Sequence, residues 1–279
     1  MSTELLHPVA IRSGAKRRDG FRPLPLWLVV PGVVAVTYLA LPIVTLMART
    51  PWSRFLEILT SPAVWQALRL SLITASITTV IAVVLGLPLA WWLGTGNSRL
   101  HGIVRLIVTV PMVLPPVVGG AALLFTLGRN APLGQFLFEA FGISLPFTAT
   151  AVVLSQLFVA MPFLVIAIEG AFRTSAGHLE EAAYTLGARP WTVFTKVTLP
   201  VIRPALLGGI ALCWARAIGE FGATMTFAGS IRGTTQTLPV AINELLGFDL
   251  DAALTASSVM IVLAVAVLFV LRGRWLSGR

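Results

Sequence analysis

The stretch EAAYTLGARPWTVFTKVTLP, residues 181–200, decides how this chain is organised, because it is a polar segment between two long apolar runs. Written as a pattern it is Glu-Ala-Ala-x3-Gly-x9-Val-x-Leu-Pro. The flanking runs, about 149–172 and 204–229, are each long enough to cross a hydrocarbon core as a helix. The stretch therefore predicts a water-exposed segment joining two membrane-spanning helices.

The composition of the whole chain agrees with a membrane location. Of its 279 residues, 57% are hydrophobic and 11% are charged, whereas a soluble domain carries about 25% charged residues. The apolar runs are continuous and do not alternate, so they predict helices and not barrel strands. The expected class is an all-α integral membrane protein.

Six runs are long enough to be membrane spans, with a cytoplasmic loop between the fourth and the fifth. The predicted spans are about 26–48, 69–93, 104–128, 149–172, 204–229 and 252–271. Together they form one transmembrane domain, 26–271, with a basic tail at 1–25, a loop at 173–203 and a basic C-terminus at 272–279. The first run is longer than the apolar part of a signal peptide and has no small-x-small cleavage site, so we expect it to be retained.

The distribution of Lys and Arg predicts the orientation. With the N-terminus inside, 14 of the 20 Lys and Arg residues fall in cytoplasmic segments, 5 fall outside and Arg216 lies within a span. Positive charge is held on the cytoplasmic side. Both termini and residues 181–200 are therefore expected in the cytoplasm, where the formal charge of +9 also faces anionic lipid.

Several classes of function are disfavoured by the sequence. The chain has a positive net charge, but it has no soluble domain on which aromatic and basic residues alternate, as they do in proteins that bind single-stranded nucleic acid. This disfavours nucleic-acid binding. The single Cys213 lies within a span, and His7, His101 and His178 are scattered, so a metal cluster is not expected. There is no Gly-x4-Gly-Lys-Ser/Thr motif and no catalytic constellation, which predicts a protein that is not an enzyme and binds no cofactor itself.

The first part of the polar segment predicts a short amphipathic helix. Leu179, Ala182, Ala183 and Leu186 follow the i, i+3, i+4, i+7 spacing of one apolar stripe. An apolar stripe in water needs a partner surface, and small residues suit a shallow groove. Packing of the stripe on the chain's own helices or on the lipid surface is an equally open alternative.

The second part of the segment predicts a turn and a second short helix. Gly187 suits a left-handed cap that ends the first helix. Pro190 is well placed to open a second helix that runs through Val197. We expect Leu199-Pro200 to end this second helix and return the chain to the membrane.

This pattern is similar to the EAA loop of binding-protein-dependent ABC importer permeases, with Val197 where that pattern has isoleucine. The resemblance implies a type I importer permease fold in which the loop forms a coupling helix that docks into a separate ATPase. It also implies that ATP and Mg²⁺ bind to that ATPase and not to this chain. The residues implied in the contact, or in positioning it, are Glu181, Ala182, Ala183, Gly187, Leu199 and Pro200.

Further motifs resemble the molybdate or tungstate branch of these permeases. They are PMVLPPVVG at 111–119, GRNAPLG at 128–134, GEFGAT at 219–224 and GTTQTLP at 233–239, and Ala131 departs from a glycine common in that branch. The resemblance implies a homodimer with two ATPase subunits and an extracytoplasmic oxyanion-binding protein, in the cytoplasmic membrane of a bacterium. Segments near 49–68, 129–148 and 230–251 are the expected docking surface for that binding protein.

The first of these motifs predicts a broken third span. Pro115 and Pro116 remove backbone donors, and Gly119 permits close approach of another helix. Broken helices in membranes occur where they are buried in protein or line a cavity. We assign these three residues to the translocation path as part of a gate, with a purely structural kink as the alternative.

Charge inside the fifth span points to the same path. Arg216 and Glu220 are one helical turn apart, and a charge at membrane depth costs about 2.5–3.5 kcal/mol unless it is paired or hydrated. A mutual i, i+4 pair is favoured over a role in attracting substrate. Thr224 would add a hydroxyl to the same lining.

Two other functions remain open from the residues. A sulfate or thiosulfate permease of the same superfamily would carry a similar tetrahedral dianion through a similar pore. A secondary transporter driven by an ion gradient could use Arg216 and Glu220 as coupling charges, but residues 181–200 would then have no role.

Overall fold

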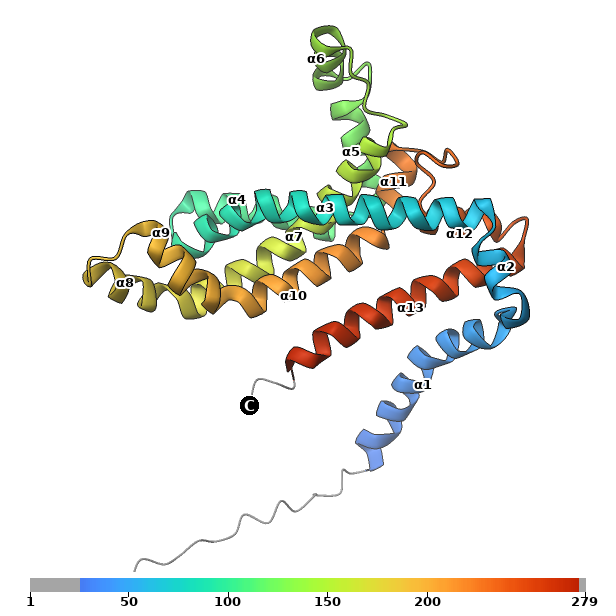
Figure 1. Ribbon diagram of the computed structural model, residues 1–279, viewed down its shortest axis with the longest axis horizontal. Helices are drawn as coiled ribbons and strands as arrows, with labels where there is room; N and C mark the ends of the chain where they lie inside the picture. Colours follow the sequence, from blue (N-terminus) through green and yellow to red (C-terminus); the bar gives the residue numbers. More distant parts are fainter. Residues whose placement is uncertain (1–25, 276–279) are drawn as a thin grey trace, which may run out of the picture. The chain divides into compact units, whose positions relative to one another are not determined.

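The computed structural model describes residues 26–275, and the predictions made for the tails at 1–25 and 276–279 lie outside them. Within 26–275 the chain forms helices joined by turns, without strands (Figure 1). This confirms the predicted all-α class. The chain divides at Val44 into two units, and most of α1 (Leu26–Arg49) belongs to the first, so it is described by itself as an apolar helix.

The remaining helices belong mainly to the second unit. They are α2 (Phe55–Leu59), α3 (Pro62–Thr95), α4 (Arg99–Val113), α5 (Pro116–Leu127), α6 (Pro132–Phe141), α7 (Ala149–Ala171), α8 (Gly177–Thr185), α9 (Pro190–Val193), α10 (Leu199–Ile218), α11 (Gly222–Phe227), α12 (Leu238–Leu245) and α13 (Leu250–Trp275). Because α13 continues to Trp275, the tail predicted to begin at 272 starts inside this helix.

Five helical segments of the described chain are long and apolar enough to cross a membrane, and α4 with α5 forms a sixth if a bent pair counts as one span. The predicted third span, 104–128, is not continuous: α4 and α5 meet at 117°. Leu114 and Pro115 each precede a proline, which disfavours helical ψ, and their ψ angles are 136° and 132°. The predicted break is therefore confirmed, and it is sharp.

The predicted fifth span, 204–229, is wrong as a single helix. It begins earlier, at Leu199, and ends at Ile218, after which the short α11 follows. The chain leaves the helix at Gly219, and the Glu220 carboxylate accepts the backbone N–H of Ala223 at 2.9 Å. A carboxylate at this position stabilises the start of a new helix, α11.

Leu199-Pro200 does not end the second short helix, contrary to expectation. A π-helical turn, Phe194–Thr198, joins α9 to α10, and the N–H of Leu199 bonds to the carbonyl of Phe194, five residues earlier. The wider turn leaves room for the ring of Pro200, whose missing N–H needs no acceptor. The helix therefore continues through the proline.

The core of the second unit is formed by α3, α7 and α10. Small side chains on α3, such as Ala75 and Ala82, are fully buried and belong to the same hydrophobic cluster as Leu164 and Ile168 of α7. A Cβ added to Gly209 of α10 would lie 3.1 Å from Leu164 Cδ1. Small residues let membrane helices pack closely, which explains how these three helices lie together.

Helix α3 also marks the two ends of this unit. It has 34 residues, because it begins seven residues before the predicted span and ends two residues after it. α8 and α9 lie at the end where α3 finishes, and α2 and α12 lie at the end where it begins (Figure 1). The polar residue Gln66 lies in the first two turns of α3, before the predicted span, and does not interrupt the helix.

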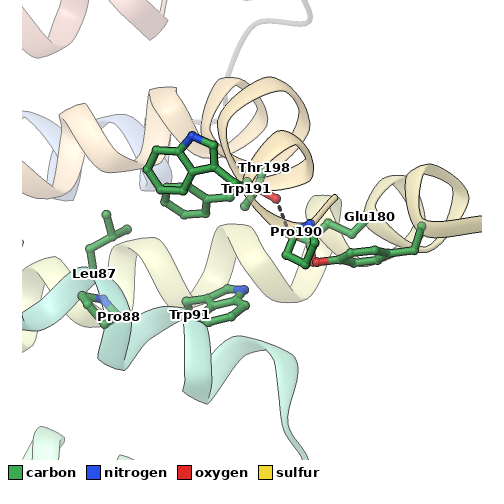
Figure 2. Close-up of a pocket in the computed structure, with 9 residues that line it drawn as sticks. Leu87, Pro88, Trp91, Glu180, Pro190, Trp191 and Thr198 are labelled. Atoms are coloured by element: carbon green, nitrogen blue, oxygen red, sulfur yellow. Dashed lines mark hydrogen bonds between the residues drawn. The ribbon is translucent and has the colours of Figure 1, made fainter. Parts of the chain in front are cut away.

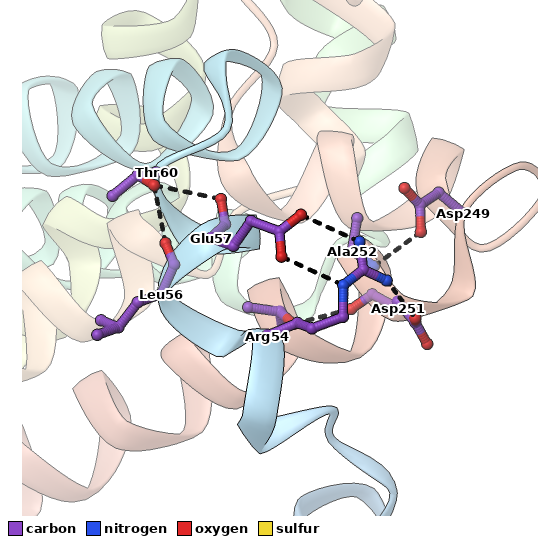
Figure 3. A network of polar contacts seen from close by, with 8 residues as sticks. Arg54, Leu56, Glu57, Thr60, Asp249, Asp251 and Ala252 are labelled. Carbon is purple, nitrogen blue, oxygen red and sulfur yellow. Dashed lines mark hydrogen bonds and ion pairs between the residues drawn. The ribbon is translucent and has the colours of Figure 1, made fainter.

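A polar network joins α2 to the start of α13 (Figure 3). Arg54 Nη2 lies 3.2 Å from Glu57 Oε1, and Arg54 Nη1 lies 3.5 Å from Asp251 Oδ2. The hydrogen bond and charge of Arg54 lower the pKa of Glu57. Beside this network Ile58 is buried against α3 and α12, while Leu56 is 73% exposed, so α2 packs on its own chain through one face only.

Candidate functional site

Helix α8 carries the Glu-Ala-Ala part of the pattern and ends at a glycine cap. Gly187 has φ +78°, the left-handed conformation that was predicted for it. The N–H of Ala188 reaches back to the carbonyl of Ala183 at 3.1 Å, as in a Schellman motif. Pro190 then opens α9, also as predicted.

The apolar stripe of α8 faces away from the long helices. Leu179 is 51% exposed and Leu186 is 87% exposed. The other side of α8 faces the bundle: Glu180 accepts a hydrogen bond from the hydroxyl of Thr198, and Tyr184 lines a cavity against α3. This orientation argues against the alternative in which the stripe packs on the chain's own bundle.

A cavity of about 360 Å³ separates the α8–α9 segment from α3. Trp91 of α3 lies on one side and Trp191 of α9 on the other (Figure 2). The other residues that line it are Leu87, Pro88, Glu180, Tyr184, Pro190, Phe194 and Thr198. The segment and α3 therefore face each other across this cavity through aromatic and proline side chains and are not packed together there.

The predicted break before α5 and the unpredicted break before α11 meet in space. A Cβ added to Gly222, at the start of α11, would lie 2.8 Å from Pro116 Cβ at the start of α5. A Cβ added to Gly120 would lie 2.8 Å from the backbone of Ala223. The motifs at 111–119 and 219–224, about a hundred residues apart in sequence, thus form one contact in which α5 and α11 touch backbone to backbone.

We expect Gly120→Ala to destabilise the fold by about 1–3 kcal/mol, because the added methyl group must push α5 and α11 apart. Thermal unfolding of the purified chain in detergent measures this. Gly208→Ala in α10 is the matched control, since a Cβ there has nothing within 4 Å. Equal melting temperatures for both variants would contradict the close contact.

Arg216 and Glu220 form the predicted ion pair. Arg216 Nη1 lies 2.6 Å from Glu220 Oε2, and the Glu220 side chain is 1% exposed against 28% for Arg216. The other carboxylate oxygen of Glu220 accepts the N–H of Ala223. Both carboxylate oxygens of Glu220 therefore have partners inside the protein: one neutralises the charge of Arg216, and the other caps the start of α11.

The remaining predicted path residues take different environments. Pro115 is exposed at the break, while Gly119 is buried against the ring of Phe158. Thr224 is fully buried in α11, and its hydroxyl has no hydrogen-bond partner among the described residues; the same holds for the Gln156 amide nitrogen. Sequence reasoning missed Gln156, although it is an amide within an apolar run.

A second buried charge was also missed. Glu169 of α7 is 6% exposed, and its Oε1 lies 2.6 Å from Arg105 Nε and 3.5 Å from Arg173 Nη1. Arg105 also donates to the carbonyl of Leu93 at 3.3 Å. This cluster ties α4 and the end of α3 to α7, just before the π-helical turn Phe172–Ala176 that leads into α8. The signal was Glu169 itself, the only charged residue in the predicted fourth span.

The predicted site residues thus fall into two separate groups. The Glu181–Gly187 group lies on α8 and its cap, with Leu199 and Pro200 in the first turn of α10. The Pro115, Pro116, Gly119, Arg216, Glu220 and Thr224 group gathers around the two breaks. Helix α10 connects the groups, because it begins at the first and ends at the second. Within residues 26–275 no three His, Cys, Asp or Glu side chains are placed to hold a metal ion.

These features define a multi-pass helical membrane protein with an exposed short helical segment at one end and two helix breaks that lie against each other. The chain belongs to the family described as binding-protein-dependent transport system inner membrane component, whose family model matches residues 86–276. The predicted family resemblance is confirmed.

Comparison with individual proteins agrees. The chain is 46% identical over 244 residues to the molybdenum transport system permease protein ModB of Mycobacterium tuberculosis, covering 88% of this chain and 92% of that protein. It is 37% identical over 220 residues to ModB of Escherichia coli K12, covering 79% and 96%. A bacterial ABC transporter involved in the import of the acidic polysaccharide alginate has a similar fold, with a TM-score of 0.73 at 18% identity, covering 91% and 96%.

Proposed function

We propose that this chain is the membrane-spanning permease subunit of an ATP-driven importer of molybdate or tungstate. Its relatives named ModB, molybdenum transport system permease proteins that align over most of the chain, support molybdate or tungstate as the substrate. The observation that carries the coupling to ATP is the outward-facing apolar stripe of α8, which ends in the left-handed cap at Gly187. The chain acts as a transport subunit and not as an enzyme.

The α8 surface is the docking site for a separate ATPase. An exposed short apolar stripe fits a groove on a partner, as in helix-in-groove recognition. Glu181, Ala182, Ala183 and Gly187 form the contact, and Leu199 with Pro200 carries the connection into α10. ATP and Mg²⁺ bind to the ATPase, since the chain has no phosphate-binding Gly-x4-Gly-Lys motif of its own.

The paired breaks form the gate of the translocation path. α10 leads from the α8–α9 segment to the Arg216–Glu220 pair, and α11 then packs on the broken end of α5. A displacement of α8 is transmitted along α10 to this contact, so the path alternates between outward and inward access. Pro115, Pro116, Gly119 and Thr224 line or shape the gate.

The complete transporter contains two copies of this chain, two ATPase subunits and an extracytoplasmic oxyanion-binding protein. It lies in the bacterial cytoplasmic membrane with both termini of this chain in the cytoplasm, as the excess of Lys and Arg favours. Many large apolar side chains of the second unit remain exposed, including Leu106, Phe125 and Leu268, and they suit lipid or a second copy.

Reconstituted proteoliposomes test this function. We expect labelled molybdate to accumulate only when the liganded binding protein is outside, ATP is inside and the ATPase subunit is present. Preference for sulfate with the same partners would overturn the substrate assignment. Uptake by the purified chain alone under an ion gradient would overturn the assignment of ATP as the energy source.

A further inference from the structure

A cavity of about 610 Å³, lined by polar side chains and by Leu70 and Ile73, lies at the end of the second unit far from α8. Two arginines line it, Arg69 from α3 and Arg232 from the turn before α12, together with Gln66 and Thr234. Both arginines are exposed, so the cavity is open to water. Its polar lining consists largely of hydrogen-bond donors.

The turn that carries Arg232 is tightly built. The carbonyl of Ile231 accepts the N–H groups of Thr234 at 3.0 Å, Thr235 at 2.8 Å and Gln236 at 3.0 Å. The Thr235 hydroxyl accepts the N–H of Ile231 at 2.9 Å in return. Gly233 has φ +72°, a conformation that glycine adopts without strain.

The same turn is fixed against α3. A Cβ added to Gly233 would lie 3.3 Å from Gln66 Oε1, and the N–H of Leu238 donates to the hydroxyl of Ser71 at 2.7 Å. Arg232 therefore shares one cavity with Arg69 because the backbone around both is anchored, and not because a loose loop happens to lie there.

Neither arginine has a carboxylate within 4.0 Å among the described residues, whereas Arg54 pairs with two carboxylates and Arg105 and Arg216 pair with one each. Glu244 lines a smaller neighbouring cavity that Arg232 also borders, but its Oε2 accepts the Gln236 amide at 2.6 Å. Two uncompensated guanidinium groups with an amide and a hydroxyl suit a tetrahedral dianion, which accepts several hydrogen bonds at once.

The position of the cavity fits a role at the opposite membrane face from α8. Arg69 is 18 residues before Leu87, which lines the cavity beside α8. At 1.5 Å per residue this places the two cavities about 27 Å apart along α3, close to the thickness of a hydrocarbon core. If α8 meets the ATPase inside, this cavity opens outside.

We propose that the Arg69–Arg232 cavity is a low-affinity receiving site for a tetrahedral oxyanion, occupied after release from the binding protein and before passage through the gate. The role of this site in molybdate import rests on the proposed function. The ability of the site to bind a dianion is independent of that function. Exposure to water and salt keeps the affinity low, which allows the anion to move on. A carboxylate of the docked binding protein is the competing occupant that the experiment must separate.

Arginine labelling tests anion binding without transport. The intact permease–ATPase complex in nanodiscs is treated with phenylglyoxal in molybdate, in sulfate or in chloride of equal ionic strength, and in a fourth sample in chloride with the binding protein added. Modified residues are quantified by mass spectrometry. We expect either dianion to slow labelling of Arg69 and Arg232 several-fold and to leave Arg54 unchanged. Equal rates in all three salts, or protection only by the binding protein, would overturn the receiving site.

Transport by variants tests its use. We expect Arg69→Gln and Arg232→Gln to lower molybdate uptake by about fivefold, with the concentration of binding protein that half-saturates ATPase stimulation unchanged. Arg99→Gln is the matched control and should transport normally, because Arg99 is also exposed and has no carboxylate within 4.0 Å among the described residues, but it lies at the other end of α3, outside the cavity. A loss of uptake that extra binding protein restores would mean that the two arginines contact the binding protein instead of the anion. Normal uptake by the variants would mean that the cavity is not part of the translocation path.

If the wild-type protein does not transport molybdate at all, the proposed function is wrong, but the labelling experiment still shows whether the cavity binds a dianion.

Discussion

Ala182→Arg is expected to lower ATP-driven uptake at least about 100-fold. Ala182 is exposed on the stripe of α8, so the longer side chain is accommodated in water and the fold of this chain is unaffected. In the proposed groove of the ATPase the same guanidinium would lose its water and have no partner. A buried unpaired charge costs several kcal/mol, and about 2.7 kcal/mol already corresponds to a 100-fold weaker complex.

Two measurements separate docking from folding for this variant. Uptake is measured in proteoliposomes, and recovery of the ATPase with the tagged permease is measured after solubilisation; both should fall, while the melting temperature of the permease alone stays constant. Asn97→Arg adds the same charge at an exposed position in the turn between α3 and α4 and should leave both unchanged. Normal ATPase recovery and uptake with Ala182→Arg would refute the assignment of α8 as the coupling surface.

Glu220→Ala is expected to destabilise the permease by about 3–5 kcal/mol. The substitution removes the carboxylate that lies 2.6 Å from Arg216 and that accepts the N–H of Ala223. Because the Glu220 side chain is only 1% exposed, water cannot easily replace either interaction. Thermal unfolding in detergent is the direct measurement. Glu139→Ala is the control: its carboxylate also accepts a side-chain hydrogen bond, from Gln135, but on an exposed helix, so the loss should stay within about 0.5 kcal/mol.

A double-mutant cycle shows how much of this effect belongs to the pair. Arg216→Ala combined with Glu220→Ala should cost less than the sum of the single variants, because the double variant leaves no unpaired charge. Glu220→Gln should be intermediate, since the amide oxygen still accepts from Ala223 but carries no charge. Additive single effects would mean that Arg216 and Glu220 are stabilised independently and that the ion pair is incidental.

The helices were predictable wherever one apolar run gives one helix. α7 begins and ends within one residue of its predicted limits, α1 ends one residue after its predicted limit, and Pro115-Pro116 located the sharp break between α4 and α5. The break after Ile218 was not predicted, because Gly219–Phe221 lies in an otherwise apolar run. The Arg216–Glu220 spacing was read as one helical turn, yet the pair forms across the end of a helix.

The contacts at the site that could not be predicted from the sequence are those between residues far apart along the chain. Glu169 pairs with Arg105, which is 64 residues earlier, and spacing along the chain gives no sign of such a contact. The meeting of Gly120 with Ala223 has the same origin: each glycine-rich motif is visible alone, but their close approach depends on the packing of α5 on α11. By contrast, the cap at Gly187 is local, and local spacing was enough to predict it.

The π-helical turn Phe172–Ala176 has a consequence for tolerance of deletions. Each residue of an α-helix turns the chain by about 100°, so removing one residue between α7 and α8 would rotate every later side chain of α8 by about that angle. The apolar stripe of α8 would then face a different direction, although none of its residues had changed. Single-residue length changes at this junction should therefore be far more harmful than substitutions at the same positions.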